Sequence, residues 1–168
     1  MGNSGSGKST LAAGLAARLG VPFVELDSIF HQPGWTELPR DEFRARVADR
    51  AAGDAWVIDG NYTAVRDLVW ARADTVVWID LPRRLVMRRV IGRTIRRAVL
   101  RQELWNGNRE PSSNWLTLDP ERSIIMWAWT QHAKYRARYG EAMADPAFAH
   151  LRFVHLRSQA EVRAFVSG

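Results

Sequence analysis

The sequence predicts an α/β fold in which a parallel β-sheet lies between two layers of helices. Short apolar segments typical of strands alternate with longer helical segments along all 168 residues, and this alternation is typical of a parallel sheet covered on both sides. A glycine-rich loop opens the chain and is followed at once by helix-forming residues. Because no repeat or linker interrupts the pattern, we expect residues 1–168 to form a single domain.

The first ten residues, MGNSGSGKST, match the pattern G-x-x-x-x-G-K-[ST] of phosphate-binding loops. Glycine lets backbone N–H groups turn inward around a polyphosphate. Lys8 is placed to neutralise the β- and γ-phosphates, and the Ser9 hydroxyl can ligate Mg²⁺. Residues 11–19 form a helix whose N-terminus faces the phosphates. The loop predicts a site for ATP and Mg²⁺ made of Gly2, Asn3, Ser4, Gly5, Ser6, Gly7, Lys8, Ser9 and Thr10.

The remaining elements continue the alternation. We expect strands at residues 22–26, 56–58, 75–79 and 151–156, where apolar residues cluster. We expect helices at residues 42–52, 65–71, 83–104, 121–139 and 159–166. Proline and glycine mark residues 28–40 as a loop, and residues 106–120 are predicted to be a second loop.

Three carboxylates stand just past predicted strands, namely Asp27, Asp59 and Asp80. The carboxyl ends of parallel strands form the ligand-binding edge of such a sheet. We therefore predict that Asp59 holds Mg²⁺ directly or through water, and that Asp27 grips an acceptor substrate or polarises its hydroxyl. Asp80 fits a helix cap equally well. Capping and turn formation remain the alternative for all three residues.

Arginines crowd the predicted helix that starts at residue 83, with eight of them between residues 83 and 101. Arg89, Arg93 and either Arg96 or Arg97 share one helix face. Such a row suits the charged oxygens of a transferring phosphoryl group, a nucleic-acid backbone, or simply a solvated surface. On the later helix, Arg136 and Arg138 could close the same site, whereas Trp127 and Trp129 lie in an apolar run and are predicted to be core residues.

The composition narrows the classes of partner. A net charge of +6 and a pI near 10.6 predict anionic partners, either nucleotides or nucleic acid. Only Lys8 and Lys134 are lysines among the 24 basic residues, so the lysine of the loop stands out. Zero cysteines exclude disulfides and thiolate metal sites. No membrane-length apolar run and no signal-peptide pattern is visible, so a cytoplasmic protein without a membrane partner is expected.

Several segments resemble one group of known proteins. They are GNSGSGKST, then Leu26-Asp27 with Pro33-Gly34-Trp35, then Trp56-Val57-Ile58-Asp59-Gly60-Asn61-Tyr62, and finally Glu103-Leu104-Trp105 with Gly107-Asn108-Arg109-Glu110. Spread over nearly the whole chain, these segments are similar to the adenylate-kinase-related P-loop proteins, and most similar to the branch called DNA topology modulation proteins.

The resemblance implies a three-layer P-loop NTPase fold of the nucleoside-monophosphate-kinase type. The implied strand order is 2-3-1-4-5, with an arginine-bearing lid at about residues 83–120. Lys8 and Ser9 would contact phosphates and Mg²⁺, and Asp59-Gly60 would match the aspartate-glycine pair that ends the third strand. Adenylate kinases continue after this pair with Phe-Pro-Arg, whereas this chain has Asn61-Tyr62. An adenosine-monophosphate acceptor is therefore not implied.

Two classes of function fit these features. One is a Mg²⁺-dependent phosphotransferase that moves the γ-phosphoryl of ATP to an unidentified small acceptor. The other is a nucleotide-gated regulatory or nucleic-acid-binding ATPase, which the high pI favours although no nucleic-acid-binding signature is present. For the first class we predict catalytic roles for Lys8, Arg89, Arg93 and Arg136, metal contacts from Ser9 and Asp59, and a nucleotide contact from Arg157. The predicted acceptor-binding residues are Asp27, Trp35, Gly60, Asn61 and Arg109.

A phosphate-binding loop normally follows a buried strand, yet only Met1 precedes this loop. In the implied order that strand is the central one, between the strands that end at Asp59 and Asp80. Without it both neighbours would carry unpaired main-chain groups, each costing about 1–3 kcal/mol. We therefore expect roughly five to eight further residues, mostly Val, Ile or Leu, ahead of Met1 in the native protein. In the present chain the two neighbouring strands should flank an empty or distorted slot.

Overall fold

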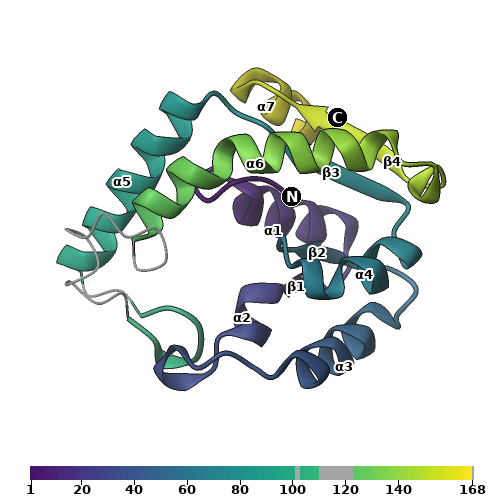
Figure 1. Ribbon diagram of the computed structural model, residues 1–168, viewed down its shortest axis with the longest axis horizontal. Helices are drawn as coiled ribbons and strands as arrows, with labels where there is room; N and C mark the ends of the chain where they lie inside the picture. The colour runs from purple at the N-terminus through teal and green to yellow at the C-terminus, as the bar shows by residue number, and fades with distance from the viewer. Residues whose placement is uncertain (101–102, 110–122, 168) are drawn as a thin grey trace.

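The computed structural model describes residues 1–100, 103–109 and 123–167 (Figure 1). The strands found there are β1 (Phe23–Glu25), β2 (Val57–Asp59), β3 (Thr75–Ile79) and β4 (Arg152–Leu156). The α-helices are α1 (Lys8–Leu19), α2 (Leu26–Phe30), α3 (Arg40–Ala51), α4 (Arg66–Arg72), α5 (Arg83–Val99), α6 (Ile124–Ala144) and α7 (Gln159–Ser167). The 3₁₀ turns are η1 (Pro33–Trp35), η2 (Thr63–Val65), η3 (Trp105–Gly107) and η5 (Pro146–Phe148).

Most predicted elements are confirmed within a few residues, and β3 has the predicted bounds. The segment after β1 differs, because α2 (Leu26–Phe30) begins at Leu26, which was predicted to end the strand, and continues into residues 28–30, which were predicted to be loop. Leu26, Ile29 and Phe30 have helical spacing and pack in the cluster around Phe43, and this burial stabilises the short helix. Asp27 therefore lies in the first turn of α2 rather than in a loop beyond a strand.

The predicted lid region is described only in part. Helix α5 ends at Val99, so the expectation of a helix to residue 104 was wrong. Residues 101–102 and 110–122 lie outside the described residues. These ranges include Arg101, Glu110, most of the predicted 106–120 loop and the predicted start of the next helix at residue 121. Helix α6 begins at Ile124 after Ser123, whose side chain accepts a hydrogen bond from the Met126 amide.

The strands form two separate parallel pairs. β1 pairs with β2 so that Glu25 lies opposite Asp59, and β3 pairs with β4 so that Ile79 lies opposite Leu156. The predicted order 2-3-1-4-5 counts the strand expected ahead of the loop as strand 1, so β1 to β4 of the structure correspond to its strands 2 to 5. Both observed pairings belong to this order, but among the described residues no strand joins β2 to β3. The full order therefore stays a prediction.

The gap between β2 and β3 is a cavity of about 570 Å³, which we call the slot. Residues of both strands line it, together with residues of α1, α4 and α7. Protein interiors are normally close-packed, with few voids larger than a water molecule. The expectation of a slot between the strands that end at Asp59 and Asp80 is thereby confirmed.

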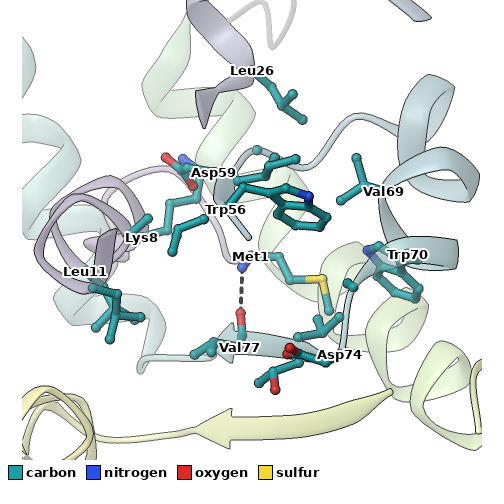
Figure 2. Close-up of a pocket in the computed structure, with 18 of the residues that line it drawn as sticks. Met1, Lys8, Leu11, Leu26, Trp56, Asp59, Val69, Trp70, Asp74 and Val77 are labelled. Carbon is teal, nitrogen blue, oxygen red and sulfur yellow. Dashed lines mark hydrogen bonds between the residues drawn. The ribbon is translucent and has the colours of Figure 1, made fainter. Parts of the chain in front are cut away.

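Met1 lines the slot and lies among the other labelled residues of its wall (Figure 2). The Met1 amino group donates to the Val77 carbonyl at 2.6 Å, and the Ile79 amide donates to the Met1 carbonyl at 2.9 Å. Gly2 lies opposite Ile79 in an isolated parallel bridge. Burial lowers the pKa of the Met1 amino group from 8.0 to about 6, an effect that nearby Asp59 opposes and Lys8 reinforces.

We expect the free energy of unfolding of the chain that begins at Met1 to rise between about pH 6 and pH 8. In this window the unfolded amine binds a proton that the folded amine has lost, so stability rises with pH. A shift of about two pKa units corresponds to at most about 3 kcal/mol. Urea denaturation at both pH values measures the rise. Acetylating the Met1 nitrogen should abolish this rise in the free energy of unfolding. An equal rise in the acetylated protein would show that other titrating groups cause it.

The strand pair β3–β4 has helices on both faces. Val76 and Trp78 pack in clusters with residues of α4 and α6, whereas Ile79 packs with Leu11 of α1 and Val90 of α5. Alternate side chains of one strand thus enter opposite layers. Figure 1 shows α6 crossing one side of this pair, with α1 behind it.

The two tryptophans predicted to be core residues of α6 differ from each other. Trp127 packs in the core, but Trp129 is 47% exposed, so that prediction was wrong for Trp129. The Arg83 guanidinium lies over the Trp129 ring at 3.8 Å and covers it instead. Within the part of the chain that the structure describes, no helix is both long and apolar enough to cross a membrane.

Candidate functional site

The phosphate-binding loop is fixed by contacts that leave no room for larger residues. Asn3 holds it from within, because its side-chain oxygen accepts from the Ser4 amide at 2.8 Å and its side-chain nitrogen donates to the Ala128 carbonyl at 2.7 Å. Gly5 has a φ of 78°, and a Cβ there would lie 2.6 Å from a Val90 methyl carbon. The loop therefore requires glycine at this position for both conformation and space.

The predicted metal-binding pair is brought together at the start of α1. The Ser9 hydroxyl donates to Oδ2 of Asp59 at 2.5 Å, although the two residues are 50 positions apart. Asp59 is only 4% exposed, and β2 carries it to the carboxyl edge of the strand pair. A hydroxyl and a carboxylate oxygen are hard donors of the kind that Mg²⁺ prefers, so these two residues fit a magnesium site.

Two predicted arginines reach the loop from α5. Arg93 donates to the Ser4 hydroxyl at 2.7 Å, and Arg89 donates to the Ser6 carbonyl at 3.3 Å. Arg89 also donates to the side-chain oxygen of Gln159 at the start of α7. The helix face predicted from spacing therefore points its guanidinium groups at the loop, where they can meet phosphate oxygens.

Asn61 anchors the start of the loop. Its side-chain oxygen accepts from the Gly2 amide at 3.2 Å, and its side-chain nitrogen donates to the Gly2 carbonyl at 2.5 Å. The amide thus takes both main-chain hydrogen bonds that a neighbouring strand would offer Gly2. Gly60 packs against Leu26, because a Cβ added to residue 60 would lie 2.7 Å from the Leu26 side chain. Acceptor contacts by Asn61 and Gly60 stay predictions.

Two carboxylates and a tyrosine lie beside the metal-binding pair, around the start of α2. The Tyr62 hydroxyl donates to Asp27 at 2.7 Å, and burial, followed by the charge of Asp27, raises the Tyr62 pKa far above its usual value. Glu25 lies opposite Asp59 across the β1–β2 ladder. Burial raises the Glu25 pKa, while the hydrogen bond from the Trp105 indole at 2.6 Å lowers it. This region is consequently rich in hydrogen-bond acceptors.

Residues 103–109 close over this region. The Asn108 side chain accepts from the Trp35 amide at 2.9 Å and donates to the Gln32 carbonyl at 2.9 Å. The Trp35 indole donates to the Arg109 carbonyl at 3.0 Å. The rings of His31 and Trp105 stack with centroids 5.9 Å apart. Predicted acceptor residues Trp35 and Arg109 are therefore brought together, although the Arg109 side chain points to Glu103 and is 61% exposed.

The other predicted site residues lie away from the loop contacts. Arg136 donates to Asp80 at 2.9 Å, and His155, which stacks on Trp78, also contacts Asp80. Asp80 is thus a buried ion-pair residue rather than a helix cap. Three further predicted residues also lie elsewhere. Arg138 donates to the Thr63 hydroxyl, Arg157 donates to the neighbouring His155 ring, and Thr10 is exposed. Phosphate contacts by Arg136, Arg157 and Thr10 stay predictions.

Sequence reasoning missed four residues that shape the site, namely Glu25, Tyr62, Asn108 and Gln159. Glu25 lies two residues before Asp27 at the end of a predicted strand, and this spacing of two carboxylates was a signal that could have identified it. Tyr62 and Asn108 lie inside segments that carry the resemblance, but nothing in the sequence joins Asn108 to Trp35, 73 positions earlier. Gln159 carries no sequence signal, because its role depends on α7 beginning beside α5.

Comparison with known proteins supports the architecture. No protein-family description matches the chain, and no curated protein matches it. Among solved structures, a gluconokinase from Sinorhizobium meliloti 1021 is similar, with a TM-score of 0.50, 20% sequence identity, and coverage of 99% of this chain and 89% of that one. At this identity the similarity concerns the fold alone. The chain has an α/β fold like that of this gluconokinase.

Proposed function

We propose that the protein is a Mg²⁺-dependent phosphotransferase that moves the γ-phosphoryl of ATP to a hydroxyl of a small acceptor. The observation that carries this proposal is the 2.5 Å contact between Ser9 and Asp59. It places a hydroxyl and a carboxylate at the base of a glycine-rich loop, the arrangement that holds Mg²⁺ in P-loop enzymes. Arg89 and Arg93 donate hydrogen bonds to residues of the same loop.

Each residue of the site has a definite task in such a transfer. Lys8 and the two α5 arginines neutralise charge on the phosphate oxygens, and Ser9 and Asp59 hold Mg²⁺, which supplies further charge neutralisation when bound. Asp27, held by the Tyr62 hydroxyl, orients the acceptor hydroxyl and takes its proton. Residues 103–109 exclude water from the acceptor, which favours transfer over hydrolysis.

The charges around Asp27 favour a neutral or cationic acceptor. Glu25, Asp27 and Asp59 lie close enough for each neighbouring charge to raise the Glu25 pKa. An acceptor with its own carboxylate would meet these like charges, whereas hydroxyl groups could donate to them. The rings of His31, Trp35 and Trp105 add flat apolar faces at the same place. A polyol or amino alcohol fits this chemistry better than an acid.

The nucleotide-gated regulator is less well supported. A nucleic-acid interface requires basic side chains on an open surface, but Arg89 and Arg93 are turned toward the phosphate-binding loop. A substrate screen separates the two classes. ADP formation from Mg-ATP should rise severalfold with one group of neutral or cationic hydroxyl compounds. A rise with duplex DNA and with none of the small acceptors would favour the regulator.

We expect Asp27→Asn to raise the acceptor KM or lower kcat by roughly 10²-fold, the size of a general-base contribution. Asparagine keeps an oxygen that can accept from Tyr62, so the fold and ATP affinity should be retained. Steady-state kinetics and nucleotide titration measure the two effects. The control is Asp49→Asn, an exposed aspartate on α3. Normal acceptor kinetics in Asp27→Asn would remove Asp27 from the acceptor site.

A further inference from the structure

We propose that the outward side of α5, together with the residue that follows it, docks on the surface of an anionic lipid bilayer. We call this side the outer stripe. Its apolar part is Ile91, Ile95, Val99 and Leu100, and its basic part is Arg84, Arg88 and Arg96. The contact is independent of phosphotransfer, and it differs from the expectation of a protein without a membrane partner. That expectation rested on the lack of a membrane-length apolar run, which a helix lying along a bilayer surface does not need.

The apolar part of the outer stripe is exposed as a group. Ile91, Ile95, Val99 and Leu100 are 40%, 55%, 73% and 65% exposed. Among the described residues nine large apolar side chains are exposed, and these four lie within ten positions, whereas the other five are spread over α1, β1, α6 and α7. Single exposed apolar side chains are ordinary, but a contiguous group marks an interaction surface.

Helix α5 has two apolar rows, of which its packing uses one. In the inner row Val86 and Val90 are 1% and 0% exposed and pack with Leu11 and Ala128. The outer row begins five residues after the inner row, so it lies about 140° further round the helix and faces away from this core. The inner row alone accounts for how α5 is held on the protein. The outer row is left for a partner.

The charges of α5 select an anionic partner. Seven of its 17 residues are arginine, and none is acidic. Arg84 and Arg88 precede the apolar part on the same face, and Arg96 lies beside it; all three are exposed. A second copy docked through the same face would bring arginines against arginines, because α5 offers no carboxylate to pair with them. Anionic lipids supply phosphates for the guanidinium groups and acyl chains for the apolar side chains.

The position of α5 suits a contact with a flat surface. Figure 1 shows α5 at the edge of the molecule, with α6 on its inner side. From residue 84 to residue 99 the stripe runs for about 22 Å along the helix. Arginine has an apolar stem, so its guanidinium can stay among lipid headgroups while neighbouring apolar side chains enter the acyl region. A nucleic-acid backbone offers phosphates but no apolar layer, which favours lipid as the partner.

Sedimentation of the full chain with sucrose-loaded vesicles tests the proposal. One set of vesicles is phosphatidylcholine alone, and the other contains about 30% phosphatidylglycerol, which supplies the negative charge. We expect binding to the anionic vesicles to exceed binding to the neutral ones by roughly tenfold or more. Ile95→Ser with Val99→Ser, and separately Arg84→Gln with Arg88→Gln, should each weaken binding to the anionic vesicles by roughly tenfold or more, because apolar burial and charge both contribute.

Two matched pairs of substitutions are the controls. Leu19→Ser with Val166→Ser removes two exposed apolar side chains from other elements, and Arg40→Gln with Arg50→Gln removes two exposed arginines from α3. Both should bind the anionic vesicles as the unaltered protein does. A loss with the α3 pair equal to that with the α5 arginine pair would show that net charge alone drives binding and would overturn the proposal. Failure of the unaltered protein to bind anionic vesicles would overturn it as well.

The same variants distinguish other occupants of the outer stripe. Without vesicles, a urea midpoint lowered more by Ile95→Ser with Val99→Ser than by Leu19→Ser with Val166→Ser would show that the protein itself covers the stripe. A dimer that the first pair converts to a monomer in sedimentation equilibrium would identify a second copy as the occupant. Duplex DNA bound more tightly than the vesicles, and equally well by the first pair, would identify a polycation contact. Each of these three results would contradict docking on lipid.

Discussion

Lys8→Ala should lower the turnover of Mg-ATP by roughly 10²-fold or more, which is the scale of losing one charge partner of a transition state. Lys8 is the first residue of α1, at the end of the phosphate-binding loop. The other lysine of the chain, Lys134, lies on α6. No second lysine is therefore available at the loop to take over the charge.

Lys134→Ala is the matched control for this substitution, because it removes the same group from an exposed position. Its turnover and nucleotide affinity should equal those of the unaltered protein. Circular dichroism establishes that both variants are folded, and nucleotide titration with steady-state assays gives the effect. A folded Lys8→Ala protein with unaltered affinity and turnover would show that the loop does not bind the transferred phosphate.

Asp59→Asn should raise the Mg²⁺ concentration needed for half-maximal activity by roughly 10-fold to 100-fold. A neutral amide is a poor ligand for a hard cation, whether Asp59 acts directly or through water. The amide oxygen of asparagine can still accept a hydrogen bond from the Ser9 hydroxyl, as Asp59 does at 2.5 Å, so we expect the variant to remain folded. Activity titrations with Mg²⁺ at saturating ATP measure the shift.

Asp27→Asn serves as the comparison for Asp59→Asn, since it changes a neighbouring carboxylate in the same way. We expect its Mg²⁺ dependence to be normal and its acceptor kinetics to be altered. The same metal-dependent defect in both variants would contradict the division of roles between the two residues.

The parts of the site that the sequence predicts are those set by local spacing. The glycine-rich loop, Lys8 and Ser9 follow from a pattern of ten residues, and Asp59 follows from its place after a short apolar strand. Helical spacing was enough to put Arg89 and Arg93 on one face, and the structure turns that face toward the loop. Local periodicity is reliable here because helices and strands fix the direction of each side chain.

The parts that sequence reasoning missed depend on distant segments meeting. Asn108 meets Trp35 across 73 positions, and Trp105 meets Glu25 across 80. Arg136 pairs with Asp80 because α6 crosses the end of β3. Trp129 was misjudged for a related reason, since the apolar run gave no sign that Arg83 would cover its ring. Single-sequence patterns contain no information about such pairs.

The fate of the γ-phosphoryl group tests the proposed phosphotransfer most directly. ATP labelled in that group is incubated with the protein, Mg²⁺ and the best acceptor from the screen, and label in acceptor and in inorganic phosphate is counted. We predict one labelled acceptor molecule for each ADP formed and little labelled inorganic phosphate, with formation of labelled acceptor lowered by roughly 10²-fold in Lys8→Ala. Label found only in inorganic phosphate, at a rate that no acceptor changes, would contradict phosphotransfer and identify the protein as an ATPase.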